Sequence, residues 1–162
     1  MNKMHQWSII TEEPAQTRAH GRLLGKRLHG REIVCCFGEM GAGKTTFVQG
    51  LAQGIGIAKG VWSPSFVLVR EHHGRLKFFH VDAHRLEHVN SEQVHEWIDL
   101  ENCLERNGVI AIEWAEHLGN NIPANRLDVY FEHLSVGRRV TMVPKGKHYE
   151  KLVCRLKEFQ KQ

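Results

Sequence analysis

The stretch from Cys35 to Thr46, CCFGEMGAGKTT, decides the fold that this sequence predicts. An apolar, strand-like run ends at Gly38, and glycines separate it from Lys44-Thr45, which opens an amphipathic segment. The spacing matches the phosphate-binding pattern G-x-x-x-x-G-K-[ST], in which glycine backbones approach phosphate oxygens closely. A helix beginning near Lys44 would point its positive end at the same anion. We therefore expect a nucleotide site here, with Lys44 on the β and γ phosphates and the Thr45 hydroxyl on Mg²⁺.

The overall composition is that of an ordinary folded domain. The chain has 162 residues, 41% of them hydrophobic and 25% charged, so we expect one domain over residues 1–162. No apolar run reaches the roughly 18 residues of a membrane-spanning helix, and the first residues lack the apolar segment of a signal peptide. These features favour a cytoplasmic protein. The neighbours Cys35 and Cys36 are expected to be reduced and to lie on opposite faces of one strand.

Charge is distributed unevenly along the chain. Between Asp82 and Glu116, nine acidic side chains stand against two arginines. From Arg138 to Gln162, eight lysines and arginines stand against two glutamates. One interpretation is two solvated surfaces, and the other is a basic end that meets RNA or an acidic partner.

The order of elements predicts an α/β fold. The first half should hold a helix starting at Thr11–Pro14, a strand from about Glu32 to Phe37, a helix from Lys44 to about Ile55, and hairpin strands Phe66–Glu71 and Leu76–Val81. The second half should hold a helix over Ser91–Arg106, a strand ending at Glu113, two strands around a turn at Ser135–Gly137, and a final helix. The first helix should carry an apolar stripe of Ala15, Ala19, Leu23, Leu24 and Leu28, and the final helix should bury Tyr149, Leu152, Val153, Leu156 and Phe159. This order predicts a P-loop NTPase-like three-layer fold with a mixed sheet, in which a parallel core carries antiparallel strands on one side.

Two predicted strands end in an acidic residue that could serve the phosphate loop. The run VIAIE ends at Glu113 and is continuously apolar, as a buried parallel strand is. This places Glu113 at the carboxyl edge of the sheet, where ligands bind. The run LKFFHVD ends at Asp82 but belongs to a hairpin. We therefore assign Glu113, with Thr45, to the Mg²⁺ shell and Asp82 to a supporting or water-positioning role, so that Lys44, Asp82 and Glu113 are the catalytic candidates.

Two further segments carry weaker signals. Ser63–Phe66 lies between the phosphate-loop helix and the hairpin, where many P-loop proteins have a loop that senses the γ-phosphate. The alternative is a turn fixed by Pro64. His84 and His88 are four residues apart and could bind zinc from one helix face, although ordinary surface or hydrogen-bonded histidines are favoured.

The sequence also weighs against some common uses of a phosphate loop. It contains no N-K-x-D, so guanine specificity has no support, and no arginine-rich lid segment follows the phosphate-loop helix. The missing lid weakens a small-molecule kinase, which must cover the phosphoryl group that it transfers. That kinase and a nucleotide-sensing binding module remain the alternatives to a partner-dependent ATPase.

Five ordered segments of this chain resemble the TsaE (YjeE) family. They are GEMGAGKTTFVQGLAQGIGI, SPSFVLVRE, FFHVDAHRLE, IEWAEHL and IPANRLDV, and the likeness extends from about Thr11 to Gly146. The family pattern is G-D-L-G-A-G-K-T-T, S-P-T-[FY]-x-L-V, H-x-D-x-Y-R, I-E-W and a late G-R. Here Glu39-Met40 replaces Asp-Leu, Ser65 replaces Thr, and His84 replaces the usual Tyr.

The resemblance implies an accessory ATPase of weak activity that uses ATP and Mg²⁺. Such a protein acts on the TsaD–TsaB heterodimer, which forms threonylcarbamoyladenosine at position 37 of tRNA, and ATP turnover resets that machine. By position, the resemblance implies phosphate binding by Gly38, Gly41, Ala42, Gly43, Lys44, Thr45 and Thr46, Mg²⁺ binding by Thr45 and Glu113, an adenine side near Ile10 and Glu12, and nucleotide contacts from Ser65, Trp114 and Arg138. Separately from the resemblance, the charge distribution suggests that the basic C-terminal segment contacts tRNA or an acidic surface of the partner.

Overall fold

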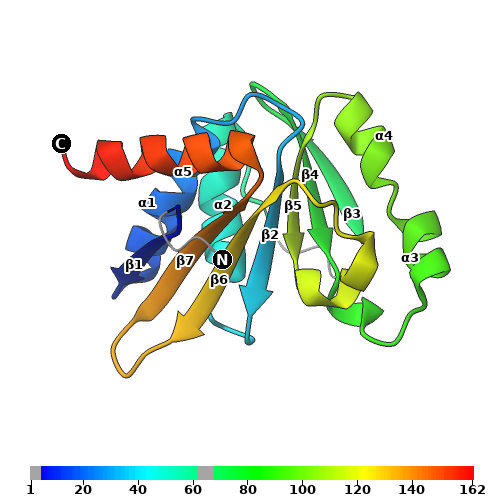
Figure 1. Ribbon diagram of the computed structural model, residues 1–162, viewed down its shortest axis with the longest axis horizontal. Coiled ribbons are helices and arrows are strands. Elements are labelled where there is room, and N and C mark those ends of the chain that lie inside the picture. The colour runs from blue at the N-terminus through cyan, green and yellow to red at the C-terminus, as the bar shows by residue number, and fades with distance from the viewer. Residues whose placement is uncertain (1–4, 62–67) are drawn as a thin grey trace.

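The structure is a computed structural model that describes residues 5–61 and 68–162. Seven strands form one sheet in the order β1-β7-β6-β2-β5-β4-β3 (Figure 1). The strands are β1 (Trp7–Thr11), β2 (Ile33–Gly38), β3 (Val69–His73), β4 (Lys77–Asp82), β5 (Val109–Glu113), β6 (Arg126–His133) and β7 (Arg138–Lys145). The α-helices are α1 (Pro14–Gly25), α2 (Lys44–Ile55), α3 (Ser91–Trp97), α4 (Leu100–Glu105) and α5 (Lys147–Gln160), and two 3₁₀ helices are η1 (His84–Leu86) and η2 (Ala115–Asn121).

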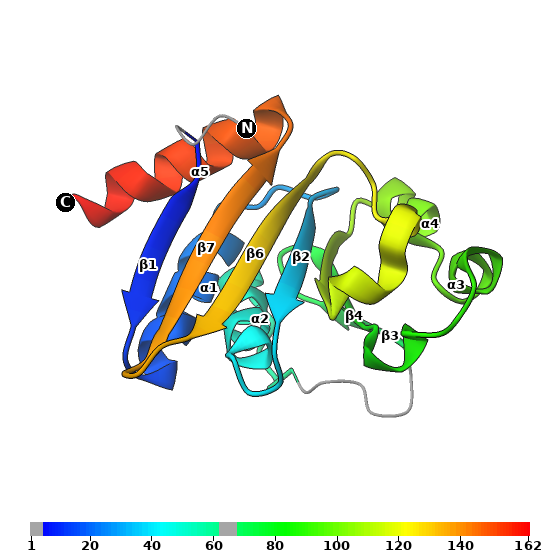
Figure 2. The ribbon, with the colours of Figure 1, turned by 60° about the horizontal axis from the view of Figure 1, so that its bottom comes forward.

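The sheet has a parallel centre and antiparallel edges. Strands β4, β5, β2 and β6 are parallel neighbours, while β3 pairs antiparallel with β4, and β7 and β1 continue antiparallel beyond β6 (Figure 2). The predicted mixed sheet is confirmed, but antiparallel strands lie on both sides of the parallel centre instead of on one. The reason is that the apolar strand β4 is buried and joins β5, whereas its polar hairpin partner β3 is partly exposed and becomes an edge.

Helices cover both faces of the sheet. One core cluster joins α1, α2 and α5 to one face, and a second joins α3, α4 and η2 to the other face of the central strands. Cys36 belongs to the first cluster and Cys35 to the second, so the expectation for these neighbours is confirmed. All four cysteines are free.

The buried face of α1 differs from the predicted alanine and leucine stripe. Of the predicted stripe, Leu24 and Leu28 are buried and Leu23 packs against the core, but Ala15 and Ala19 are exposed. The other buried residues of this helix are Thr17, Gly21 and Gly25. A Cβ atom on Gly21 would lie 2.1 Å from the carbonyl oxygen of Phe47 in α2. In the other direction, a Cβ on Gly50 would lie 2.0 Å from the carbonyl oxygen of Arg18. The two helices approach so closely that only glycine fits at the contact. Helix α1 therefore turns its glycines, and not the predicted alanines, toward α2.

The chain also enters α1 differently from the prediction. Thr11 does not cap the helix, because it ends β1, an edge strand absent from the predicted elements. The Thr11 hydroxyl is hydrogen-bonded to the Thr17 hydroxyl at 2.7 Å. The helix is capped at Glu13, where Gln16 Oε1 accepts from the backbone N–H of Glu12 at 2.7 Å and of Glu13 at 3.2 Å. Pro14 occupies the first helical position, as predicted.

The helix predicted over Ser91–Arg106 is broken into α3 and α4. Ile98 is extended, with φ −129° and ψ 97°, and it is buried. Asp99 then caps α4 by accepting a hydrogen bond from the Asn102 N–H at 3.0 Å. Burial of Ile98 and the capping preference of aspartate together outweigh continuation of the helix.

The C-terminal elements follow the prediction closely. Strands β6 and β7 meet at a turn in which Gly137 has φ 74°. Helix α5 buries the predicted apolar residues except Phe159, whose ring is exposed and lies 3.7 Å below the Arg27 guanidinium carbon. Within the described ranges, no helix is long and apolar enough to cross a membrane.

Candidate functional site

The loop between β2 and α2 has the backbone that a phosphate cradle needs. Helix α2 begins at Lys44, as predicted, and Gly43 precedes it with φ 109°. Gly41 has φ 75°, and no heavy atom lies within 4 Å of a Cβ built on it. Residues other than glycine rarely adopt these angles. The loop therefore exposes backbone N–H groups at the positive end of a twelve-residue helix.

Lys44 lies against this loop with its ammonium group enclosed. Its Nζ atom donates to the carbonyl oxygens of Gly38 and, at 2.9 Å, of Glu39. The same atom lies 3.9 Å from the ring centroid of Trp114. Burial lowers the pKa of Lys44, and the carboxylates of Glu116 and Glu113 oppose that shift. Phosphate oxygens offer this ammonium stronger acceptors than the two carbonyl groups do.

Thr45 and Glu113 form the oxygen pair predicted for the metal. The Thr45 hydroxyl donates to Glu113 Oε1 at 2.6 Å. The other carboxylate oxygen, Oε2, lies 2.5 Å from Nε2 of His80, a fully buried histidine on β4. Hard oxygen donors beside a phosphate loop are the donor set that Mg²⁺ takes. The residues therefore fit Mg²⁺, with His80 holding the carboxylate in place.

Asp82 lies beside Glu113 at the same edge of the sheet. The two residues are direct neighbours in the parallel pairing of β4 with β5. Asp82 Oδ1 accepts hydrogen bonds from the His84 backbone N–H at 3.1 Å and from the His84 ring at Nδ1, 2.9 Å away. The zinc alternative gains no support, because the described part of the chain holds no group of three or more His, Cys, Asp or Glu suited to a metal.

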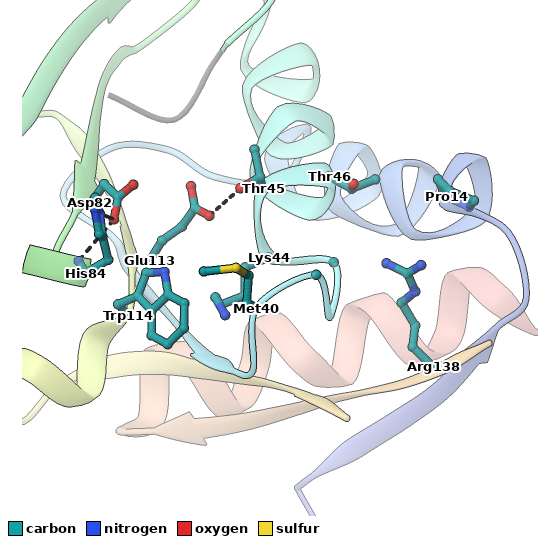
Figure 3. Close-up of a pocket in the computed structure, with 12 residues that line it drawn as sticks. Pro14, Met40, Lys44, Thr45, Thr46, Asp82, His84, Glu113, Trp114 and Arg138 are labelled. Carbon is teal, nitrogen blue, oxygen red and sulfur yellow. Dashed lines mark hydrogen bonds and ion pairs between the residues drawn. The ribbon is translucent and has the colours of Figure 1, made fainter. Parts of the chain in front are cut away.

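Lys44, Thr45, Asp82, His84 and Glu113 line one cavity of about 430 Å³ (Figure 3), a volume in the usual range of ligand sites. The predicted site residues that line it are Gly41, Gly43, Lys44, Thr45, Thr46, Asp82, Glu113, Trp114 and Arg138. Pro14 and Met40 also line it and were missed, while His84 was noted as a possible zinc ligand and as a departure from the family pattern but not as a nucleotide-site residue. Of the remaining predicted residues, Gly38 accepts a hydrogen bond from Lys44 through its backbone carbonyl, and Ala42 is buried. Ser65, with the segment Ser63–Phe66, lies outside the described residues.

Arg138 brings a second cation to the phosphate loop. It is the first residue of β7, and its Nη1 atom would lie 2.4 Å from a Cβ on Gly43. Its Nε atom is buried and has no hydrogen-bond partner among the residues that the structure describes. A guanidinium that lies over the loop with a donor left unpaired fits an anionic ligand.

Ile10 and Glu12 do not line the cavity but lie close to it. They flank Thr11, which pairs with Arg138 between β1 and β7, and Ile10 is 62% exposed. Figure 3 shows Arg138 and Pro14 at the end of the cavity opposite Asp82 and His84. Contact of Ile10 and Glu12 with adenine stays a prediction.

Trp114, directly after Glu113, has an unusual backbone. Its φ of 58° and ψ of 42° are in the left-handed region, which bulky residues rarely adopt. The indole ring stacks on His117 with centroids 5.6 Å apart, and His117 Nδ1 lies 2.8 Å from the carbonyl oxygen of Ala83. Such strained residues cluster at functional sites, and here the conformation turns the ring toward Lys44.

Comparisons with known proteins identify a family for this chain. The family model "Threonylcarbamoyl adenosine biosynthesis protein TsaE" matches residues 11–140. The tRNA threonylcarbamoyladenosine biosynthesis protein TsaE of Bacillus subtilis is 30% identical over 151 residues, which are 92% of each chain. The protein of the same name from Treponema pallidum is 32% identical over 80% of this chain and 94% of its own length. The crystal structure of Bacillus subtilis YdiB superposes with a TM-score of 0.81 at 27% identity and covers 96% of both chains. With its P-loop fold and a family match over most of its length, the chain belongs to the TsaE family.

Proposed function

We propose that this chain is an ATP-binding and ATP-hydrolysing accessory subunit of tRNA threonylcarbamoyladenosine formation, and that it acts on the TsaD–TsaB heterodimer in the cytoplasm. The observation that carries the proposal is the meeting of Lys44, Thr45 and Glu113 in one cavity at the start of α2. Membership of the family supports the pathway, because the relatives are named for threonylcarbamoyladenosine biosynthesis.

In this proposal, the main residues of the cavity have separate tasks. Lys44 and the loop N–H groups bind the β and γ phosphates, and Thr45 and Glu113 hold Mg²⁺. When bound, Mg²⁺ neutralises charge on these phosphates. Arg138 lies on the side of the loop away from Glu113 (Figure 3) and neutralises a further phosphate oxygen. Trp114 keeps Lys44 near the loop until phosphate replaces the carbonyl oxygens.

Weak, partner-dependent hydrolysis is supported by the openness of the site. Met40 lines the cavity and is 82% exposed, so its apolar side chain lies at a solvent-facing wall. A phosphoryl transfer site works best when bulk water is excluded and only the attacking water molecule remains. We propose that a partner protein covers this wall and thereby raises the hydrolysis rate.

Reconstitution tests the proposal. Purified TsaD–TsaB, tRNA and the threonylcarbamoyl donor are assayed for many turnovers of tRNA modification, with and without this chain and ATP. We expect multiple turnovers only with both, and loss of this support with Lys44→Ala and with Glu113→Ala. A matched control is Gln53→Ala, an exposed position of α2 away from the cavity. Equal modification without the chain would contradict the proposal, and rapid ATP use triggered by one metabolite alone would favour the kinase.

The basic face of α5 supports a contact with tRNA. Lys147, Lys151 and Arg155 are exposed and follow one another every four residues, so they share one side of the helix. We propose that they contact the phosphate backbone. Replacing all three by glutamine should weaken tRNA binding and flatten its dependence on salt by about 0.9 in logarithmic slope for each lost contact. An unchanged slope would contradict the proposed contact with tRNA and would favour a protein surface as the partner of this helix.

A further inference from the structure

His84 is a wall residue of the nucleotide cavity with an acidic partner behind it. It is the first residue of η1 and lines the cavity together with Asp82 and Glu113. Its side chain is 41% exposed, whereas that of Asp82 is only 7% exposed. An exposed imidazole backed by a buried carboxylate at 2.9 Å is the arrangement that prepares a histidine for proton transfer.

The hydrogen bond to Asp82 fixes which ring nitrogen of His84 is available. An ionised carboxylate only accepts hydrogen bonds, so Nδ1 must carry the proton that it donates to Asp82 Oδ1. The neutral ring then has its lone pair on Nε2. In the described part of the chain, Nε2 of His84 has no hydrogen-bond partner. It is therefore a free acceptor in a cavity wall.

The position of His84 fits the end of the cavity where the terminal phosphate would lie. Lys44 and Thr45 mark the β and γ phosphates, and Glu113 beside Thr45 marks the metal. Asp82 is the register neighbour of Glu113 and continues the site away from Arg138 (Figure 3). The nucleoside then extends toward Pro14 and Arg138, which leaves His84 on the side of the γ-phosphate.

The neighbouring histidine shows what a structural role looks like in this fold. His80 is fully buried, lines no part of the cavity and bonds Glu113. His84 differs on each of these points, because it is exposed, lines the cavity and bonds the acid that has no assigned metal. A residue that only supports the fold would not need to face the cavity.

We propose that His84 is a catalytic residue that accepts the proton of the attacking water, and that Asp82 is the positioning residue that holds its ring. The proposal rests on the proposed ATP hydrolysis. Water oxygen forms a bond to the γ-phosphorus while the bond from that phosphorus to the β–γ bridging oxygen breaks, and ADP leaves with the electron pair. The water proton passes to His84 Nε2 and then to solvent, so ATP and water give ADP and phosphate. In this chain, the imidazole of His84 would accept a proton, which the neutral phenol of the family's tyrosine does far less readily.

Single-turnover hydrolysis of ATP tests the proposal, with the protein in excess over ATP and with TsaD–TsaB added. ATP affinity is measured in parallel. His84→Gln should leave ATP affinity within about threefold and lower the rate constant by about 10²-fold, the usual share of a general base. His84→Tyr, which restores the family residue, should be equally slow. The control is His88→Gln, a histidine whose side chain is 91% exposed and outside the cavity, and it should match the unmodified chain.

Two further measurements separate proton transfer from support of the fold. Imidazole added to His84→Gly should restore part of the rate, because it replaces the missing base, while a structural defect would not respond. Asp82→Asn should lower the rate constant without lowering ATP affinity, and the double variant with His84→Gln should be no slower than the slower single variant.

The outcomes distinguish the two levels of the proposal. If the unmodified chain hydrolyses ATP and either His84→Gln or His84→Tyr hydrolyses it equally fast, the proposed role of His84 is wrong. The proposed ATPase activity would still stand. A chain that binds ATP but never hydrolyses it, alone or with TsaD–TsaB, would overturn both.

Discussion

The two faces of the sheet are covered by helices of different length and packing. On one face lie α1, α2 and α5, with 12, 12 and 14 residues, and the first two interlock through their glycines. On the other face lie α3 and α4, with 7 and 6 residues, and two 3₁₀ helices. The phosphate loop is anchored in the well-packed face, whereas His84 and Trp114 belong to short turns on the other. We infer that the loop before α2 is rigid and that the cavity wall formed by His84 and Trp114 is easier to move.

The largest effect should come from breaking the interlock. Gly50→Ala adds a methyl group only 2.0 Å from the Arg18 carbonyl oxygen. Although alanine favours helix by about 1 kcal/mol over glycine, the collision should lower the free energy of unfolding by about 3 kcal/mol. Urea unfolding measures this, with the exposed Gln53→Ala of the same helix as control. A stabilised Gly50→Ala variant would show that the two helices are not in close contact.

A pair of matched leucines should sharpen the comparison. Leu51 in α2 and Leu86 in η1 are both buried, at 0% and 1% exposure. Leu51→Ala should cost about 2.5–3 kcal/mol, because interlocked helices cannot collapse into the space that the side chain leaves, and Leu86→Ala about 2 kcal/mol, because a short turn can. Chemical denaturation of both variants gives the difference. Equal costs would argue that the two faces are equally rigid.

Tyr149 should give a smaller effect that depends on pH. Its hydroxyl oxygen accepts the Ile33 N–H at 2.9 Å and ties α5 to the start of β2. Tyr149→Phe leaves that buried N–H unpaired and should cost about 1–2 kcal/mol at neutral pH. Unfolding of both proteins at neutral pH measures this cost, and a neutral substitution would mean that the hydrogen bond contributes nothing.

Burial raises the pKa of Tyr149 to about 12. The folded state therefore binds the phenolic proton more tightly than the unfolded chain, whose pKa is about 10. This contribution is present below about pH 10 and is lost as pH rises toward the folded value. Unfolding between about pH 9 and about pH 11 should show the advantage over Tyr149→Phe shrinking. An advantage that does not change over this range would contradict the raised pKa.

The smallest predicted effect is a rate difference between two adjacent thiols. Cys35 faces the thinly covered side and Cys36 the interlocked side, and burial raises the pKa of both. In urea below the unfolding transition, labelling should reach Cys35 about tenfold faster, which corresponds to local opening that costs about 1.4 kcal/mol less. The variants Cys35→Ala and Cys36→Ala separate the two signals, and exposed Cys154 serves as the fast internal standard. Faster labelling of Cys36 would reverse the comparison.

Local chemistry in the sequence was sufficient for the centre of the site. The phosphate-loop spacing predicts the start of α2 at Lys44, and continuous apolarity with a terminal acid predicts β5 and Glu113. These signals work because glycine conformation, helix start and strand burial are set by residues close in sequence. The mixed α/β fold was predictable for the same reason.

What the sequence did not reveal depends on contacts between distant segments. The buried face of α1 is chosen by the backbone of α2, so the predicted leucines are buried but the predicted alanines are not. Strand β1 exists because it pairs with β7, more than a hundred residues later. Pro14 and Met40 line the cavity only because these segments converge. The role of His84 depends on a ring orientation that no sequence pattern specifies.

The position of Trp114 makes the site optically observable. The centroid of its indole ring lies 3.9 Å from the Lys44 ammonium, and the ring is stacked on His117, so its emission should respond to a change in either neighbour. A ligand that draws the ammonium toward phosphate should therefore brighten or shift this one fluorophore without any dye. With the other three of the chain's four tryptophans replaced by phenylalanine, its lifetime would report on the loading of the site in real time.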